Sequence, residues 1–476
     1  MCVVSFSRLC FQNDPVGKMN TMWKAVITLA MALSGGFILT GCKGMATSEE
    51  RSARQDVKTV RESYRANDQR PNLPALTSAS SLEVFLQFAL LNHPQIEAAY
   101  YDWTASVERI TVERSLPDPK LTFESDITDI VMTVMPGLMQ EFPGPGKLKA
   151  KAAVASAESQ GKYFAFESAV LQTAFSLKKA AYELYFLNER LRINRQTLAL
   201  LGNLEGIARA QNEVGKASLQ DVLRAQIERD RVRTEIANLE DSRRPMLAAF
   251  KAALGLTQDQ ADPPLPMHLE MSPVNPDDEE LLRIAFARNP RLQAMAAEVR
   301  AAQAGITMAY KEKVPDFSLG LMADAKAAPT LFRPQATMTL PIWRDKLAAE
   351  VAQAQAGELA ARARLSAEQI ALTVDFAEKS FAAREIGRNL SLLQDRLVPK
   401  TRLSLEIARA GYLAGTIDFF NLMDTERTLL SFELAEVEAR TQREIVLSEL
   451  SLLIAGVPPN GAPLLKSQPP TVKPIH

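Results

Sequence analysis

Ile207-Ala208-Arg209-Ala210 recurs two hundred residues further on as Ile407-Ala408-Arg409-Ala410. In each copy an apolar run stops at a glycine, Gly215 in the first and Gly415 in the second, and a second run follows. Because glycine readily adopts a positive φ, each copy predicts a helix, a tight bend and a returning helix. The residues that open the returning run also align without a gap: Asp221, Val222 and Leu223 with Asn421, Leu422 and Met423. The chain is therefore predicted to hold two copies of one long helical hairpin.

The repeat extends outward from these bends. A helix is expected to break at Asn92-His93-Pro94, where a new helix begins with proline in its first turn, and Arg288-Asn289-Pro290 repeats this pattern. Each new helix is expected to stop at a Pro-Asp pair, at 117–118 and at 315–316. Two tandem repeats follow from this correspondence.

After each Pro-Asp pair the hydrophobic period changes from helical to two, which is typical of strands. Leu121–Ile127, Phe317–Leu321 and Gln335–Leu340 alternate clearly, whereas Val131–Phe142 alternates poorly and predicts a weaker strand. These four strands are near the length that a tilted strand needs to cross a bilayer. The polar residues expected to face inward are Lys120, Thr122, Glu124, Asp126, Thr337 and Thr339.

Four strands with a lipid-compatible face cannot stand alone in a membrane, because the backbone groups at open edges would find no water. The sheet is therefore expected to close through further copies of the chain. Two copies would give eight strands with a filled interior, and three would give twelve strands with a diameter on the order of 24 Å and a channel. The alternative is a pair of ordinary soluble hairpins under the helices.

A long helix is expected from Lys147 to about Arg209, where no proline interrupts roughly 90 Å of chain. Apolar residues repeat along it at intervals of three and four, as in a coiled coil. The predicted seams are Val170, Ala174, Leu177, Ala181, Leu184 and Leu191 in the first copy, and Ile386, Leu390, Leu393 and Leu397 in the second. Returning helices are expected from about Ser218 to Leu254 and from Asp418 to Ile454.

The N-terminus has the layout of a bacterial secretory signal. From Met19 or Met22 a short polar start precedes an apolar run, 25–39, that is too short to span a bilayer comfortably. The run ends in Leu39-Thr40-Gly41-Cys42, which resembles a lipobox, so Cys42 is expected to become the first residue and to carry lipid such as palmitate. In such signals an aspartate after the cysteine favours the inner membrane, and Lys43 therefore indicates the outer membrane.

The composition allows one large core or two modest ones and gives no basic surface. The 476 residues are 47% hydrophobic and carry a net charge of -1, which gives no footprint for nucleic acid. Cys2 and Cys10 precede the signal, so neither disulfides nor a cysteine metal site is expected in the mature chain. The expected divisions are a signal and extension (1–41), a tether (42–80), repeat one (81–257), a Pro-rich linker (258–277), repeat two (278–457) and a Pro-rich tail (458–476).

The order of elements over about 81–457 resembles the TolC-type outer-membrane efflux proteins. Ala408–Thr416, leading to Leu422-Met423-Asp424, matches that family's most recognisable stretch, and Gln140–Leu148 is similar to its heavy-metal, CusC- and CzcC-like branch. The resemblance implies a mainly α fold with a small transmembrane β part. It further implies a homotrimer with a twelve-stranded β-barrel in the outer membrane and a twelve-helix periplasmic α-barrel.

The function implied is that of a passive exit duct in a Gram-negative tripartite exporter, with no enzymatic activity and no cofactor. Its partners would be a periplasmic adaptor, an inner-membrane pump of RND type and outer-membrane lipid, and its cargo metal cations. A drug-efflux or type I secretion outlet is the alternative within this class. A periplasmic coiled-coil scaffold without a pore is the alternative from another class.

Several side chains at the bends are candidate functional residues. By position in the family, Asp424 and Asn421 match the residues that ring the closed end, and Asp221 occupies the equivalent place in the first copy. Asp418 is expected to cap the returning helix instead. Arg209 and Arg409 are candidates for ion pairs with neighbouring helices, and Gly215 and Gly415 for the bends that an adaptor contacts. Neither the histidines nor Met132, Met135 and Met139 form a metal site by their spacing.

Overall fold

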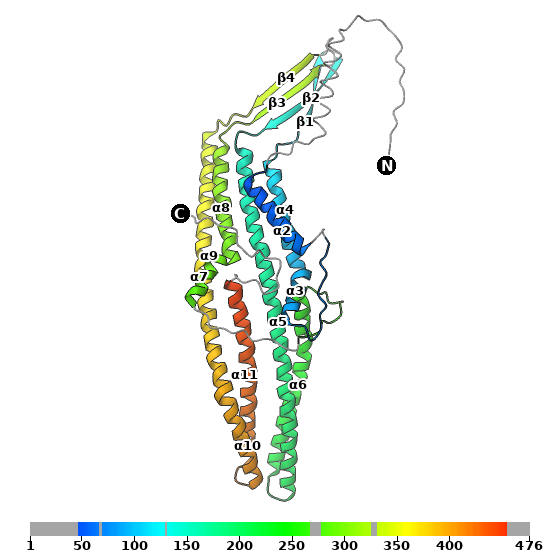
Figure 1. Ribbon diagram of the computed structural model, residues 1–476, viewed down its shortest axis with the longest axis vertical. Coiled ribbons are helices and arrows are strands. Elements are labelled where there is room, and N and C mark those ends of the chain that lie inside the picture. The colour runs from blue at the N-terminus through cyan, green and yellow to red at the C-terminus, as the bar shows by residue number, and fades with distance from the viewer. Residues whose placement is uncertain (1–45, 66–68, 129–130, 267–277, 325–330, 455–476) are drawn as a thin grey trace, which may run out of the picture. The chain divides into compact units, whose positions relative to one another are not determined.

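The computed structural model describes residues 46–65, 69–128, 131–266, 278–324 and 331–454. From Thr47 onward the contacts form one unit, whose helices and strands are labelled in Figure 1. Helix α2 covers Ser48–Tyr64. The first repeat contains α3 (Leu82–Asn92), α4 (Pro94–Arg114), β1 (Lys120–Thr128), β2 (Val131–Phe142), α5 (Lys147–Glu213) and α6 (Leu219–Ala253). The second contains α7 (Asp278–Arg288), α8 (Pro290–Lys311), β3 (Phe317–Asp324), β4 (Leu331–Met338), α9 (Arg344–Leu392), η2 (Leu393–Leu397), α10 (Val398–Ala414) and α11 (Phe419–Ile454).

The two halves repeat one another element by element, which confirms the predicted tandem repeat. The short helices end where Asn92 and Asn289 were expected to end them, and Pro94 and Pro290 begin the next helices. His93 and Asn289 cap those helices, with His93 Nδ1 accepting from the Gln95 amide at 3.2 Å and Asn289 Oδ1 from the Arg291 amide at 2.9 Å. Capping by His93 and Asn289, together with proline at the first helical position, therefore fixes these helix boundaries.

The four strands form one antiparallel sheet in the order β1-β2-β3-β4. The prediction that Val131–Phe142 is the weaker strand is wrong, because β2 runs over twelve residues and pairs on both sides. Its alternation is poor because Met135 and Met139 lie among the otherwise polar side chains of one face. Strands β1 and β4 are the two edges of the sheet in this chain.

Helix α5 is the long uninterrupted helix that the sequence predicts, with 67 residues. All six residues of its predicted seam are buried, among them Val170 and Leu177, both at 0% exposure. In the second repeat the long helix is not uniform, because a π-helical turn, η2, separates α9 from α10. Pro399 lies in the first turn of α10, and its ring crowds the carbonyl four residues back, at Asp395 in η2. Of the seam predicted here, Leu390 and Leu393 are buried and Ile386 and Leu397 are half-buried.

Helix α2 is a further difference from the sequence analysis, which predicted a tether over residues 42–80. Instead 17 residues are helical, and Thr47 caps them by accepting from the Glu50 amide at 3.1 Å. Tyr64, at the end of α2, is fully buried in the largest hydrophobic cluster, against Tyr100 of α4 and Phe166 of α5. The helix is thus packed as part of the first repeat.

Candidate functional site

The two helical bends share one backbone arrangement. Gly215 and Gly415 have φ of 73° and 77°, as their predicted role requires. After α5 the Lys216 amide donates to the Gln211 carbonyl at 2.8 Å, and after α10 the Thr416 amide donates to the Gly411 carbonyl at 2.8 Å. These bonds satisfy carbonyls that the ending helices leave open.

Gly415→Ala is expected to destabilise the protein by roughly 1–2 kcal/mol, because a left-handed φ brings Cβ close to the backbone. No neighbouring atom lies within 4 Å of the added Cβ, so the effect would come from the backbone alone. Gly202→Ala is the matched control, because Gly202 lies inside helix α5 with equally open space and alanine should stabilise it by about 0.5–1 kcal/mol. Urea unfolding should show a lower free energy of unfolding for Gly415→Ala and a higher one for Gly202→Ala. Equal changes in the two variants would contradict the proposed backbone strain at Gly415.

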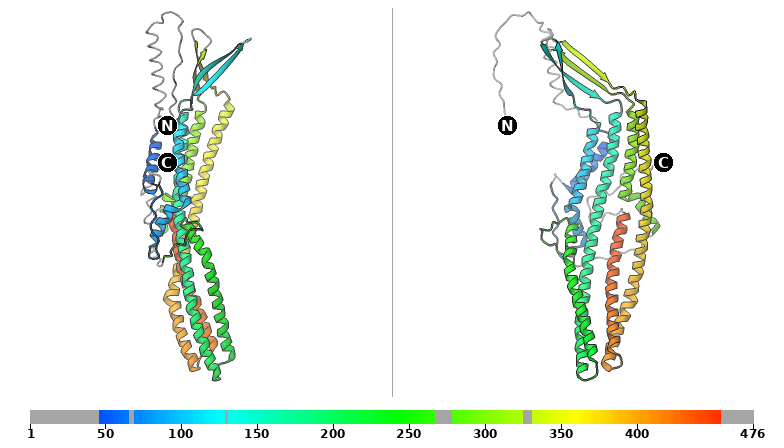
Figure 2. Two further views of the ribbon diagram at one scale, coloured as in Figure 1. Left: turned by 90° about the vertical axis from the view of Figure 1, so that its right-hand side faces the viewer. Right: turned by 180° about the vertical axis from the view of Figure 1, so that it is seen from behind.

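The two bends pack together as one four-helix tip. Figures 1 and 2 show the bends between α5 and α6 and between α10 and α11 next to each other, at the end of α5 away from the strands. A single hydrophobic cluster joins all four helices, and its buried members are Leu201, Leu204, Ala208, Val222, Ala225, Val232, Ala408, Phe419, Leu422 and Met423. We call this group the tip cluster.

The predicted gate residues lie on the outside of this tip. Asn421 and Asp424 are exposed on the first turns of α11, and Asp221 is half-buried in the first turn of α6. Asp221 closes a capping box, in which its carboxylate accepts from the Ser218 amide at 3.1 Å while Ser218 Oγ accepts from the Asp221 amide at 3.3 Å. Asp418 accepts from the Asn421 amide at 2.8 Å, which confirms the predicted cap.

A buried ion pair between the helices of the first hairpin is made by residues that the sequence analysis missed. Glu205 of α5 is buried and pairs with Arg229 of α6 at 2.5 Å. Arg209 pairs with the same Glu205, but from the same helix, at 3.0 Å. Hydrogen bonding from Gln226 and then the nearby arginines Arg229 and Arg209 lower the pKa of Glu205. Arg409 is exposed, and it makes no ion pair within the part of the chain that the structure describes.

A second buried ion pair links the two hairpins directly. Glu228 of α6, 7% exposed, pairs with Arg427 of α11. These residues lie about two turns beyond the glycine bends, beside the tip cluster. The two hairpins are therefore held together by an apolar cluster and by at least one charged contact.

At the opposite end of α5, one face of the sheet is apolar and exposed. Directly paired residues share a face, and the register places Leu121, Leu138 and Leu321 in one row across three strands. The large exposed side chains of this face are Leu121, Phe123, Leu138, Phe142, Phe317, Leu319, Leu321, Phe332 and Met338. We call this group the apolar strand face.

The opposite face carries the polar residues that were predicted to point inward. Lys120, Thr122, Glu124 and Thr337 occupy it by register. The side chain of Asp126 lies outside the described residues, and Thr339 follows the end of β4. The prediction of one lipid-compatible and one polar face is thus confirmed for these four residues.

A buried lysine joins the two repeats where strand meets helix. Lys147 Nζ lies 2.9 Å from Asp316 and 3.2 Å from Glu312, both in the second repeat. Asp316 also accepts from the Gly144 amide at 2.7 Å, and Gly146 caps α5 with φ of 86°. Gly144–Lys147 is therefore a strand-to-helix turn held by the other repeat.

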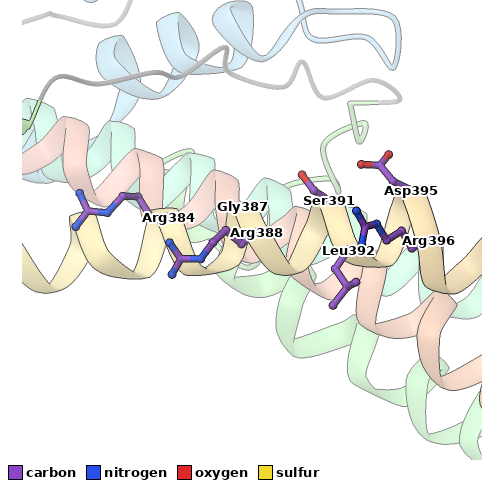
Figure 3. A pocket seen from close by; sticks show the side chains of 7 residues that line it. All are labelled: Arg384, Gly387, Arg388, Ser391, Leu392, Asp395 and Arg396. Atoms are coloured by element: carbon purple, nitrogen blue, oxygen red, sulfur yellow. The ribbon is translucent and has the colours of Figure 1, made fainter.

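Two shallow grooves lie at equivalent places in the two repeats, and both are rich in arginine. One is lined by Arg384, Gly387, Arg388, Ser391, Leu392, Asp395 and Arg396, all from α9 and η2 (Figure 3). The other is lined by Asn188, Leu191, Arg192, Arg195, Gln196, Ala199, Glu240 and Arg243 of α5 and α6. The first has only one helix as its wall, so it is an open surface and not an enclosed ligand site.

Several predicted residues and segments lie outside the described ranges. Cys42, the 1–41 signal, His268, His476 and the 458–476 tail lie outside them. Within the described ranges, no cluster of histidine, cysteine or acidic side chains is placed to hold a metal ion. Likewise, none of the described helices has a stretch long and apolar enough to cross a membrane.

Comparison with known proteins connects this geometry to a family. The model of the outer membrane efflux protein family matches residues 85–256 and 281–456, which are the two repeats. A comparison with curated proteins finds no match.

Solved structures share the fold at low sequence identity. The outer membrane protein VceC from Vibrio cholerae matches with a TM-score of 0.67 at 16% identity, over 79% of this chain and 97% of that one. CusC matches with a TM-score of 0.68 at 15% identity, over 81% and 98%. The open MtrE outer membrane channel of Neisseria gonorrhoeae matches with a TM-score of 0.67 at 16% identity, over 81% and 94%. Since the family model covers both repeats, this chain belongs to the outer membrane efflux protein family.

Proposed function

We propose that the protein is the outer-membrane exit duct of a tripartite efflux system, and that three copies close its sheet into a twelve-stranded barrel. The apolar strand face carries this proposal. Nine large apolar side chains on one side of an antiparallel sheet with two open edges suit lipid on that side and other copies at the edges. The polar opposite face suits a wet lumen.

An apolar stripe on α9 supports assembly of the helical part as well. Exposed apolar residues recur along it at intervals of four, seven or eleven, which keeps them near one side of the helix. They are Leu359, Ile370, Val374, Phe381 and Leu392. A continuous exposed stripe of this kind is what a neighbouring copy would cover. The open arginine groove around Arg388 lies beside it, where a second copy would supply the missing wall.

The lipid anchor at Cys42 belongs to the same proposal. Cys42 lies five residues before Thr47, a reach of at most about 18 Å, and Thr47 caps α2. Glu50 of α2 contacts Arg114, the last residue of α4, six residues before β1 begins. Acyl chains on Cys42 would therefore be within reach of the membrane end of the strands.

Cys42→Ala should leave the trimer intact but lower the mass of the mature protein by the lipid, as mass spectrometry would show.

At the other end we propose that Asp424 and Asn421, together with Asp221, form the constriction, and that the bends at Gly215 and Gly415, flanked by Arg209 and Arg409, contact the periplasmic adaptor. Asp424 and Asn421 are exposed in the single chain, as residues that line a shared axis must be. Three copies of Asp424 on that axis would place like charges together and attract cations.

Single-channel recording in planar bilayers tests the duct and its constriction together. Wild-type protein should give discrete conductance steps, and Asp424→Ala should raise the conductance and weaken block by divalent cations. Glu406→Ala, an exposed carboxylate on α10 outside the proposed ring, is the control and should change neither. Absence of any steps would favour the scaffold alternative, whereas unchanged currents in Asp424→Ala would remove only the gate assignment.

We propose metal cations as the cargo, delivered by an inner-membrane pump of RND type, because Gln140–Leu148 resembles the heavy-metal branch. A drug or type I secretion outlet is the second candidate.

A deletion strain should lose resistance to copper, cobalt or cadmium and keep its resistance to dyes. The reverse pattern would assign the duct to drug efflux.

A further inference from the structure

Among the described residues of the tip, one buried carboxyl group makes no hydrogen bond and no ion pair. Glu426 of α11 is 3% exposed, and within the described residues its side chain makes no hydrogen bond or ion pair. It lies one turn beyond Leu422 and Met423 of the tip cluster and one turn before Leu429, all of which are buried. Glu426 therefore occupies a place on the helix where apolar residues are expected.

The charges around Glu426 do not offset the cost of its burial: Arg427 acts to lower its pKa, but Glu228 and Glu433 act to raise it. From α6 comes the buried carboxylate of Glu228, which pairs with Arg427. On α11 itself lies Glu433, which pairs with Arg402 of α10 at 2.7 Å. From α5 comes the buried carboxylate of Glu205, which is engaged by Arg229 and Arg209. Each nearby arginine thus has a carboxylate other than Glu426.

Ionisation of Glu426 is therefore unfavourable while the two hairpins are packed together. Burial first, and then the negative charge of Glu228, raise the pKa of Glu426 from 4.5 to about 7. A carboxyl whose pKa is raised in the packed state makes that state less stable as pH rises from 4.5 to about 7. The packed tip is thus favoured by acid and weakened at alkaline pH.

We propose that Glu426 is a proton-operated latch between the two hairpins of the tip. When it is protonated, α11 packs against α5, α6 and α10 without a buried charge. When it is ionised, its repulsion from Glu228 and its need for water favour separation of the hairpins. This inference concerns the packing of one chain and does not depend on the protein conducting ions.

Hydrogen exchange of the full-length detergent-solubilised protein tests the latch. With a pKa of about 7 when packed and 4.5 when separated, local opening should become about tenfold more frequent between pH 6 and pH 8. Protection in residues 419–430, corrected for the intrinsic pH dependence of exchange, should fall by that factor. In Glu426→Gln, which resembles the protonated form, protection should change less than twofold.

Two further variants keep the test decisive. Glu406→Gln, on the exposed side of α10, should retain the tenfold change of the wild type. Glu228→Gln removes the neighbouring negative charge and frees Arg427, so the loss of protection should move to lower pH and tests the latch even where Glu426→Gln fails to fold. A tenfold change that persists in Glu426→Gln, or a midpoint that does not move in Glu228→Gln, would overturn the proposal.

Discussion

Leu319→Arg is expected to prevent the protein from inserting into lipid bilayers. Leu319 lies in the middle of the apolar strand face, 57% exposed in the single chain, between Ala336 on β4 and Gln140 on β2. Arginine on the lipid side of a barrel costs about 2–4 kcal/mol near the bilayer midplane, for each chain of an assembly. Assembly into phospholipid vesicles, followed by heat-resistant trimers on gels and by protease protection, measures the effect.

Gln335→Arg is the matched control for this experiment. Gln335 pairs with Gly320, the residue after Leu319, and so occupies the opposite, polar face at nearly the same height. The same charge should be tolerated there, because water would solvate it. If both variants insert equally well, the apolar strand face does not contact lipid and the barrel proposal fails.

Much of the fold could be predicted because its boundaries are set by local chemistry. The returning helix expected from Ser218 to Leu254 runs from Leu219 to Ala253, since Ser218 caps its start. The bend at Gly415 and the break at Asn289-Pro290 were likewise predictable from residues whose backbone preferences do not depend on partners. Because the pattern occurs in both repeats, each helix boundary assigned in one repeat could be checked against its equivalent in the other.

The errors have two sources: local signals that were not used, and contacts between segments far apart in the chain. Helix α2 is mostly polar, but Ala53, Val57, Val60 and Tyr64 form a narrow apolar stripe at helical spacing, which the sequence analysis did not use. Its ion pairs with α4 add contacts that no local pattern reveals. Strand β2 was underrated because methionines interrupt its alternation, whereas pairing on both sides holds it in the sheet. The π-helical turn at η2 had a local signal, Pro399, which the sequence analysis did not use.

The candidate residues lie beside the bends, as their positions in the sequence imply, but the sequence does not reveal the contacts around them. Asp424 and Asn421 are exposed, as a shared ring requires, yet the charges that hold the tip together are Glu205, Glu228 and their arginines. Their pairing joins segments up to 199 residues apart, so spacing along the chain gives no hint of it. Glu426 did leave a signal, because a glutamate one turn from Leu422 and Leu429 stands on an apolar face.

Glu50→Gln is expected to release α2 from the first repeat. Glu50 is 1% exposed and binds Arg114 of α4 by a charged contact, while Thr111 Oγ1 donates to it at 2.6 Å and Arg54 Nε at 3.1 Å. Removing one partner of a fully buried ion pair costs about 3–5 kcal/mol, and we expect a loss below this range because the Arg114 and Arg54 side chains are 15% and 40% exposed. The backbone amides of residues 48–64 should lose most of their protection from hydrogen exchange. Glu62→Gln, exposed on the same helix, should leave it unchanged.

An acid titration distinguishes loss of this charge from general disruption of α2. Burial acts to raise the pKa of Glu50, but hydrogen bonds from Arg114, Thr111 and Arg54 outweigh it and lower the pKa to about 2. A carboxylate with a lowered pKa contributes its full stabilisation above 4.5, and this is lost as pH falls toward 2. Protection of α2 in the wild type should therefore persist at pH 5 and decline between pH 4.5 and 2. Glu50→Gln should show no such step, and a step that survives the substitution would place the acid-sensitive group elsewhere.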